Sequence, residues 1–175
     1  FWCNHHSKLR GQPSNHMSNL LVQNIKHTNN TTAMTIDSTG RVFQPQKPMF
    51  YAKGATTSGV SSTNNIILTA TDFNVGNHYS TSTGIFTAPV AGFYQFHASI
   101  MGDNSDARLM LRLRVNGSDK SQGSSSSNSN QYQDSKVSVL LQLSASDEIN
   151  LHNAGTKTTY TLAPMESYFW GMLIG

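Results

Sequence analysis

Apolar and polar residues alternate along several short segments from Met49 onward, the pattern of β-strands that bury one face. The clearest segment spans residues 109–115, where three leucines and a valine face away from arginines, and Asn116-Gly117 follows at once as a hairpin turn. Further alternating segments are residues 92–100, 137–143 and 149–151. Short strands separated by turns predict an all-β sandwich, barrel or jelly roll.

The final segment, residues 168–174, is apolar on both faces. Such a strand is either central in its sheet or covered on its outer face by another subunit. In a chain this polar, an uncovered aromatic stripe would promote aggregation. We therefore favour the subunit interpretation.

The first 47 residues differ from the rest of the chain. We interpret residues 1–16 as an appended or upstream segment and assign no metal role to its histidines, since Met17 is a plausible natural start. Residues 17–47 hold short alternating pieces and a turn at Asp37–Gly40, and Pro45 and Pro48 then interrupt regular structure. We expect a short β-rich attachment segment over residues 17–47 and one domain over 48–175.

Composition narrows the function classes. Charged residues make up 12% of the chain, and its net charge of +3 includes no Lys/Arg run, so we expect no nucleic-acid partner. Cys3 is the single cysteine and cannot form an internal disulfide. No apolar stretch approaches the roughly 20 residues that span a bilayer, which predicts no membrane insertion. Residues 1–20 lack the hydrophobic region of a signal peptide, so standard secretion is not expected unless a leader has been removed.

A longer pattern lies in residues 73–100, where a tyrosine precedes Gly-x-Phe-x-Ala-Pro and then Gly-x-Tyr-x-Phe. This pattern resembles the signature of the complement C1q globular-head domain. Residues 115–117, 147–151 and 169–174 are similar to that family's hairpin, late strand and closing strand. The resemblance covers residues 49–175. We interpret its positions as fold determinants, not as a ligand site: Tyr79, Gly84, Phe86, Ala88, Pro89, Gly92, Tyr94, Phe96, Asn116, Gly117, Phe169 and Gly171.

The resemblance implies a ten-stranded antiparallel jelly-roll sandwich of the C1q/TNF type that assembles as a homotrimer. Candidate trimer-interface residues are then Tyr168, Trp170, Met172 and Ile174. Many relatives carry a Gly-X-Y collagen stalk, which this chain lacks, so collagen-led clustering is not expected. Residues 31–48 resemble instead the short N-terminal segments that precede such domains in bacteriophage and other microbial proteins.

Polar segments supply the candidate binding sites. Residues 118–130 are almost free of apolar side chains and predict an exposed loop, either a recognition loop for glycans or, as we favour, a linker without function. Its candidate recognition residues are Ser118, Asp119, Lys120, Gln122, Asn128 and Asn130. Asp103 and Asp106 carry oxygen ligands that suit Ca²⁺, which some family members bind, but the absence of a glycine-spaced calcium loop favours an ordinary turn. Arg108, Arg112 and Arg114 could bind an anionic partner or pair between subunits, although a solvated strand face is the default.

No catalytic motif is present, and the histidines lack the spacing of a zinc site, so we expect neither an enzyme nor a cofactor. The predicted function is that of a trimeric virion structural or adhesion protein, such as a phage fibre tip, capsid appendage or tail-associated receptor-binding module. Its expected partners are other virion proteins, through the N-terminal segment, and a host-surface glycan or protein. The alternative is a secreted or cell-surface C1q-type protein that recognises glycans or proteins.

Overall fold

The chain divides into two compact units, Phe1–Phe43 and Gln44–Gly175. All regular elements of the described residues are β-strands, and their pairings are antiparallel. The computed structural model describes residues 22–54, 59–61, 65–102, 108–125, 133–156, 159–161 and 165–175.

The first unit is a three-stranded sheet in the order β1-β2-β3. Its strands are β1 (Asn24–Lys26), β2 (Thr32–Ile36) and β3 (Val42–Phe43). The predicted turn at Asp37–Gly40 is confirmed, because the Asp37 carboxylate accepts hydrogen bonds from the backbone N–H groups of Thr39 and Arg41, each at 2.9 Å. The Arg41 side chain also donates to Asp37, at 2.7 Å. These bonds, led by the backbone bond from Arg41, lower the pKa of Asp37 to about 2.

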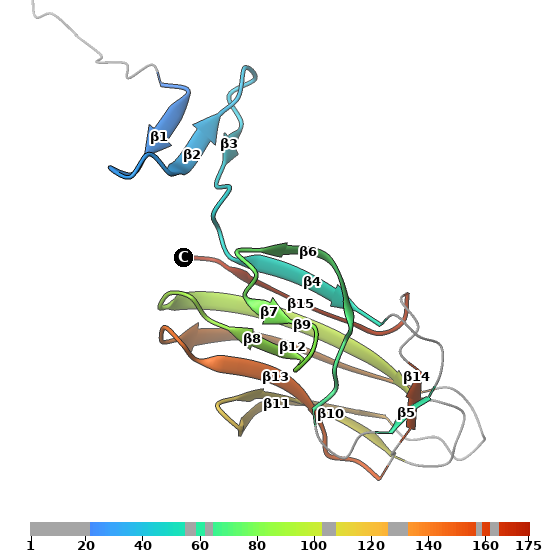
Figure 1. Cartoon of the computed structure of the whole chain (residues 1–175). Coiled ribbons are helices and arrows are strands. Elements are labelled where there is room, and N and C mark those ends of the chain that lie inside the picture. The colour runs from blue at the N-terminus through green and yellow to red at the C-terminus, as the bar shows by residue number, and fades with distance from the viewer. Residues whose placement is uncertain are drawn as a thin grey trace, which may run out of the picture. The chain divides into compact units, whose positions relative to one another are not determined.

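The second unit is a sandwich of two sheets (Figure 1). The five-stranded sheet has the order β11-β10-β13-β8-β7, with β7 (Tyr79–Ser80), β8 (Ile85–Thr87), β10 (Leu109–Val115), β11 (Ser118–Ser125) and β13 (Glu148–Asn153). The seven-stranded sheet has the order β5-β14-β9-β15-β4-β6, with β12 also paired to β9. Its strands are β4 (Met49–Lys53), β5 (Gly59–Ser61), β6 (Ala70–Val75), β9 (Gly92–Gly102), β12 (Gln133–Leu143), β14 (Thr159–Thr161) and β15 (Tyr168–Leu173).

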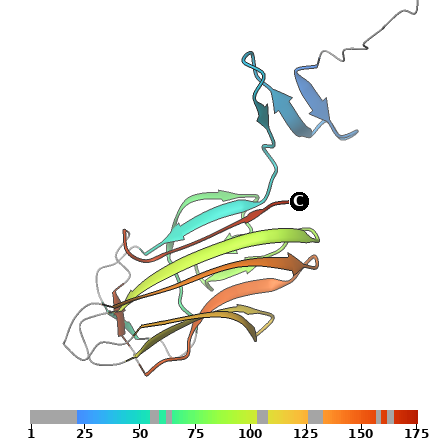
Figure 2. The ribbon, with the colours of Figure 1, turned by 180° about the vertical axis from the view of Figure 1, so that it is seen from behind.

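This arrangement confirms the predicted all-β jelly-roll sandwich. The ten expected strands correspond to β4, β6 to β13 and β15, and the described residues add the short pair β5 and β14. Figure 2 shows the seven-stranded sheet from outside, with β4, β15 and β9 side by side.

The core lies between the sheets and holds the residues that the alternation assigned to it. Three leucines of β10 and the rings of Tyr94 and Phe96 on β9 are fully buried. Phe86 on β8 lies 5.0 Å from the ring of Phe50 on β4, and Tyr79 on β7 stacks on Phe50 at 4.9 Å. Because large rings bury 150–250 Å² each, this cluster supplies much of the apolar burial that joins the sheets.

Two turns of the family pattern require an unusual backbone conformation. Gly84 has a φ of +72°, and a Cβ there would lie 2.9 Å from the carbonyl oxygen of Ile66. Asn116 and Gly117 have φ values of 49° and 77°, which is the geometry of the predicted two-residue hairpin turn. Gly92, in contrast, has an ordinary φ and is restricted by its close packing against Leu173.

The predicted loop over residues 118–130 is wrong for its first part, because residues 118–125 form strand β11. The Asn116-Gly117 turn directs this segment back along β10, and Ser118 to Ser125 pair with β10 over its whole length. Backbone hydrogen bonds to a neighbouring strand do not depend on side-chain polarity, so a serine-rich segment can complete the sheet. Asn128 and Asn130 lie outside the described residues.

Candidate functional site

The outer faces of the two sheets differ in chemistry. Among the described residues, four exposed large apolar side chains project from the outer face of the seven-stranded sheet: Phe73, Phe93, Leu140 and Met172. The exposed fraction of Leu140 reaches 59%. The described outer face of the five-stranded sheet carries no exposed large apolar side chain and holds Arg112, Arg114 and Asp119 instead. The apolar face is therefore the candidate surface for contact with another molecule.

Strand register arranges this face in rows that cross the sheet. One row runs from Phe73 on β6 through Tyr51, Trp170 and His97 to Ser138 on β12. The row beside it consists of Val75, Met49, Met172, Gln95 and Leu140. On the other side of the first row, Lys53, Tyr168, Ser99 and Lys136 form a more polar row. The face thus changes along the strands from apolar to polar.

The rings on this face contact one another and form what we call the aromatic cluster: Tyr51, Phe73, His97, Tyr168 and Trp170. The His97 ring stacks between Tyr168, at 5.7 Å, and Trp170, at 5.8 Å. Tyr168 also stacks on Tyr51 at 5.9 Å, and Tyr51 contacts Phe73 at 6.2 Å. His97 Nε2 and the Tyr168 hydroxyl lie 3.3 Å apart, within hydrogen-bonding distance. Mutual stacking orders these side chains before any partner binds, which lowers the entropy cost of binding.

Burial in this cluster also affects ionisation. The pKa of Tyr51 is raised, mainly by desolvation and then by the neighbouring Tyr168 and Asp72. Two ion pairs lie beside the aromatic cluster, one between Lys53 and Asp72 and the other between Asp134 and Lys136. The aromatic cluster thus has a charged margin, the arrangement found in protein interfaces with an apolar centre and a polar rim.

The sequence-predicted interface residues fall on or beside this face. Tyr168, Trp170 and Met172 point outward from β15, and Ile174 follows the end of the strand with 45% of its surface exposed. The strand is also central in its sheet, between β9 and β4, and Phe169 on its inner side is fully buried in the core. A central position in the sheet does not cover the outward side chains of β15. That another subunit covers them therefore stays a prediction.

Sequence reasoning missed the members of the face that lie on other strands. Tyr51, Phe73 and His97 complete the aromatic cluster from β4, β6 and β9, and Leu140 extends the face onto β12. The sequence contains one local signal of this face: Leu140 is an apolar residue at an outward position of its alternating segment. Linking the four positions requires the strand order.

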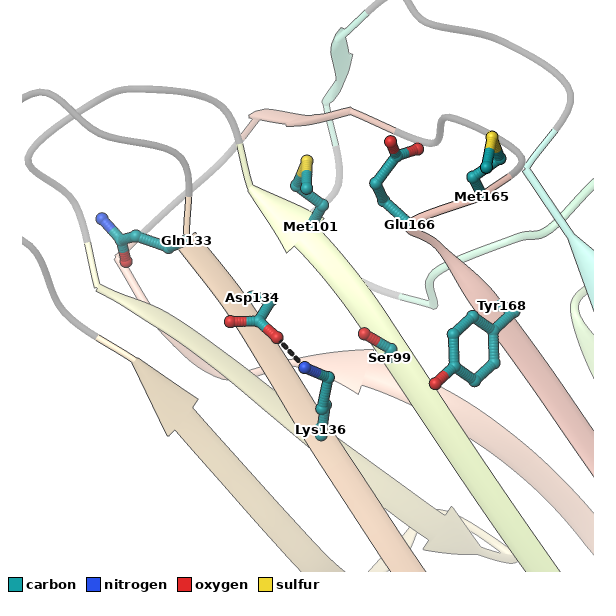
Figure 3. A pocket seen from close by; sticks show the side chains of 8 residues that line it. All are labelled: Ser99, Met101, Gln133, Asp134, Lys136, Met165, Glu166 and Tyr168. Atoms are coloured by element: carbon teal, nitrogen blue, oxygen red, sulfur yellow. Dashed lines mark hydrogen bonds and ion pairs between the residues drawn. The ribbon is translucent and has the colours of Figure 1, made fainter.

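A cavity of about 370 Å³ lies at the polar end of this face (Figure 3). Ser99 and Met101 on β9 form its middle, the ion pair of Asp134 and Lys136 on β12 one side, and Tyr168 the other. The hydrogen bond from Lys136 to Asp134 raises the pKa of Lys136. Glu166 adds a second carboxylate to the lining.

A family model of the C1q domain matches residues 49–174. The chain belongs to the C1q domain family. Its C1q domain is similar to the globular domain of zebrafish complement 1qA, with 21% identity, a TM-score of 0.60, and coverage of 74% of this chain and 98% of that one. A search of curated proteins found no match.

Two other solved structures share the fold. Eiger TNF from S. frugiperda has 16% identity and a TM-score of 0.64, and the match covers 74% of this chain and 94% of that one. Murine APRIL at pH 5.0 has 10% identity and a TM-score of 0.61, with coverage of 73% and 99%. Together with the C1q match, these similarities confirm a C1q/TNF-like fold.

The remaining candidate sites of this C1q domain have separate outcomes. The calcium candidates Asp103 and Asp106 lie outside the described residues. Within the part that the structure describes, no three His, Cys, Asp or Glu side chains gather as a metal site would require. The described residues likewise include no helix long and apolar enough to cross a membrane. Of the candidate recognition residues, Asp119 binds Arg112 and Arg114, each at 2.6 Å, and Gln122 accepts a hydrogen bond from Arg112 at 2.9 Å.

Proposed function

We propose that this C1q domain is a non-enzymatic homotrimeric module that assembles through the apolar outer face of its seven-stranded sheet. The observation that carries this proposal is the contrast between the two sheets, one with an exposed apolar outer face and the other with a polar one. Large exposed apolar patches on soluble proteins mark interaction sites. The resemblance to C1q heads, in which the family forms compact trimers, supports three copies rather than two.

The chemistry of the face suits an interface. Trp and Tyr are enriched among residues that contribute most to binding, and the aromatic cluster provides Tyr51, Tyr168 and Trp170 at its centre. The ion pairs at its margin stay near solvent when the apolar rows are covered. A closed ring of three copies would cover the face on every subunit and leave no unpaired apolar patch.

We further propose that the trimer is a virion structural or adhesion head, with the N-terminal unit as its attachment to other virion proteins. This unit has its own hydrogen-bonded sheet and exposes three large apolar side chains that a partner would cover: Ile25, Val42 and Phe43. Its resemblance to segments that precede such domains in phage proteins supports the same assignment. Detection of the protein in purified particles tests this location.

The second candidate is a secreted or cell-surface C1q-type protein that recognises glycans or proteins. The family match favours it, because proteins with C1q-like domains are typically extracellular. A cleaved leader peptide at the start of the gene product would support this candidate, and recovery of the protein only in particles would count against it.

The assembly is tested by light scattering of the full chain after size exclusion. We expect a particle of three times 19.1 kDa. Met172→Glu places a charge in the apolar row and should shift the particle toward 19.1 kDa. Val90→Glu is the matched control, because Val90 is also exposed but lies in the bend before β9, and it should leave the trimer intact.

The outcomes separate the explanations. A monodisperse wild-type monomer, or equal effects of the two glutamate variants, would refute assembly through this face. Leu140→Glu provides a second variant on the most exposed apolar position of the face, in case Met172→Glu does not fold. Circular dichroism of each variant establishes that its β-structure is retained.

A further inference from the structure

The five-stranded sheet carries a second cavity, of about 570 Å³, on its polar outer face. This volume lies in the range of 300–1,000 Å³ that is usual for small-molecule sites. The lining combines an apolar pair with polar and charged groups: Ile67, Ile85, Asn65, Thr83, Arg114 and His152. The lining comes from a single chain, and the cavity lies on the sheet opposite the aromatic cluster.

Strand pairing brings these residues together. Arg114 on β10 is paired with Asn150 on β13, and Asn150 with Ile85 on β8, which places an arginine and an isoleucine on opposite sides of an asparagine. Asn65 is paired with His152 one outward position farther along β13. The Asn150 side chain donates to the Asn65 side-chain oxygen at 2.6 Å and so fixes the amide between them. Arg114 and His152 are thus held by strands, whereas Asn65 is held by its bridge to His152 and Thr83 lies in the turn before β8.

The charge balance favours an anion. Asp119 binds both arginines of the β10 face, because one of its oxygens accepts from Arg112 Nη1 and the other from Arg114 Nε, each at 2.6 Å. One carboxylate neutralises only one of the two guanidinium groups, so one positive charge remains. Because Arg114 uses Nε for Asp119, its two terminal amino groups are available to a ligand in the cavity that it lines.

His152 adds unused hydrogen-bonding capacity. Its ring lines the cavity, and among the described residues no group hydrogen-bonds to its buried Nδ1. Burial and then Arg114 lower the pKa of His152, which favours the neutral form of the ring. A neutral imidazole, an amide and the Thr83 hydroxyl suit the hydroxyl groups of a sugar.

We propose that this cavity binds a sugar ring that bears a carboxylate group. The carboxylate pairs with the terminal amino groups of Arg114, since a guanidinium matches a carboxylate with two parallel hydrogen bonds. Asn65, Thr83 and His152 bind the ring hydroxyls, and Ile67 and Ile85 contact its apolar face. The proposal deepens the recognition role considered above by naming a ligand class, and it places the site on residues other than the serine-rich segment.

The test measures binding to the full chain by isothermal titration calorimetry with defined probes. Methyl β-D-glucuronide should bind, and methyl β-D-glucoside, which differs only in the carboxylate, should bind at least about tenfold more weakly. Sodium acetate, the carboxylate without the ring, should also be weaker. Free glucuronate distinguishes the two possible sources of the ligand. Binding of the methyl glycoside supports the terminal sugar of a glycan, and binding of free glucuronate alone supports a small metabolite.

The neighbouring arginines provide a matched pair of variants. Arg114→Gln should weaken glucuronide binding about tenfold or more, because it removes the partner of the carboxylate. Arg112→Gln removes the same positive charge from the sheet face and also breaks a contact to Asp119, so it should weaken binding in part. Because Arg112 does not line the cavity, this loss should be clearly smaller than the loss from Arg114→Gln. Equal losses from the two variants, equal binding of glucoside and glucuronide, or no saturable binding to the wild-type chain would overturn the proposal. Light scattering of the same samples reports assembly separately, so a monomer that still binds would refute the trimer and leave this site in place.

Discussion

Replacing Phe86 with alanine removes a ring that connects the two sheets of the sandwich. Phe86 comes from β8 in the five-stranded sheet and is fully buried. Its ring lies 5.0 Å from Phe50, 5.7 Å from Phe96 and 5.9 Å from Tyr94, all of which come from the seven-stranded sheet. Loss of this ring therefore removes contacts across the whole thickness of the core.

The expected cost follows from this enclosure. Phe-to-Ala changes in protein cores cost about 3–5 kcal/mol, and the value rises when neighbours cannot close the space. Here the nearest neighbours are rings held in two paired sheets, so little collapse is possible without distorting a sheet. We expect Phe86→Ala to lower the free energy of unfolding by about 4 kcal/mol, a large part of the roughly 5–15 kcal/mol typical of a domain.

Urea unfolding, followed by fluorescence and circular dichroism at a fixed protein concentration, measures this loss. A fixed concentration is needed because assembly would add to the apparent stability. Phe43→Ala is the control: it removes the same ring from the N-terminal unit, where Phe43 is half exposed, and should change domain stability by less than about 0.5 kcal/mol. A loss below about 1.5 kcal/mol for Phe86→Ala would contradict the role of this ring between the sheets.

Two further predictions concern turns. Gly84→Ala should cost at least about 2 kcal/mol in urea unfolding, because alanine must adopt a φ of +72° and place its Cβ 2.9 Å from the Ile66 carbonyl oxygen; an unchanged midpoint would contradict this. The Asp37 carboxyl should titrate near pH 2 by nuclear magnetic resonance, not near its usual 3.8. Because its folded pKa is lowered, its stabilisation of the turn is complete above the unfolded value and disappears as pH falls through about 2; a midpoint near 4 would mean that the bonds to Arg41 do not form in solution.

The strands and the core were largely predictable, because the alternation of apolar and polar residues shows which side chains face the core and which face solvent. Leu109, Leu111 and Leu113 are fully buried, as their spacing predicts. The Asn116-Gly117 turn was equally local, since both residues tolerate positive φ. The family pattern added the jelly-roll architecture, which no single segment contains, but not the pairing of individual strands.

Strand β11 was not predictable by composition. Its polar residues resemble a loop. They form a strand because they pair with the edge of β10 and because Gly123 allows the backbone of Lys136 to approach closely. The pairing with β10 is local, because the two strands form one hairpin, whereas the contact with Lys136 comes from another strand, β12; neither contact can be inferred from the composition of residues 118–125. The cavity beside Arg114 was likewise hidden in the sequence, because pairing between β8, β10 and β13 brings together Ile85, Arg114 and His152, and a bridge adds Asn65.

The aromatic cluster could not be predicted from the sequence either. Tyr51, Phe73 and His97 each occupy an outward position that would be unremarkable on a solvated sheet. They become one surface because β15 lies between β4 and β9 and sets them in register with Tyr168 and Trp170. Only the sheet order, and not the spacing along the chain, reveals this neighbourhood.

The central position of β15 has a consequence for how the protein is made. During translation β4 emerges first and β9 later, yet both must wait for Tyr168–Leu173, the final strand, before they can join into one sheet. Until then the ribosome-bound chain presents two unpaired edges, which are prone to associate with other chains. The sandwich can therefore close only after nearly all of it has been synthesised, and a chain that stops before residue 168 would be left with its sheet in two pieces.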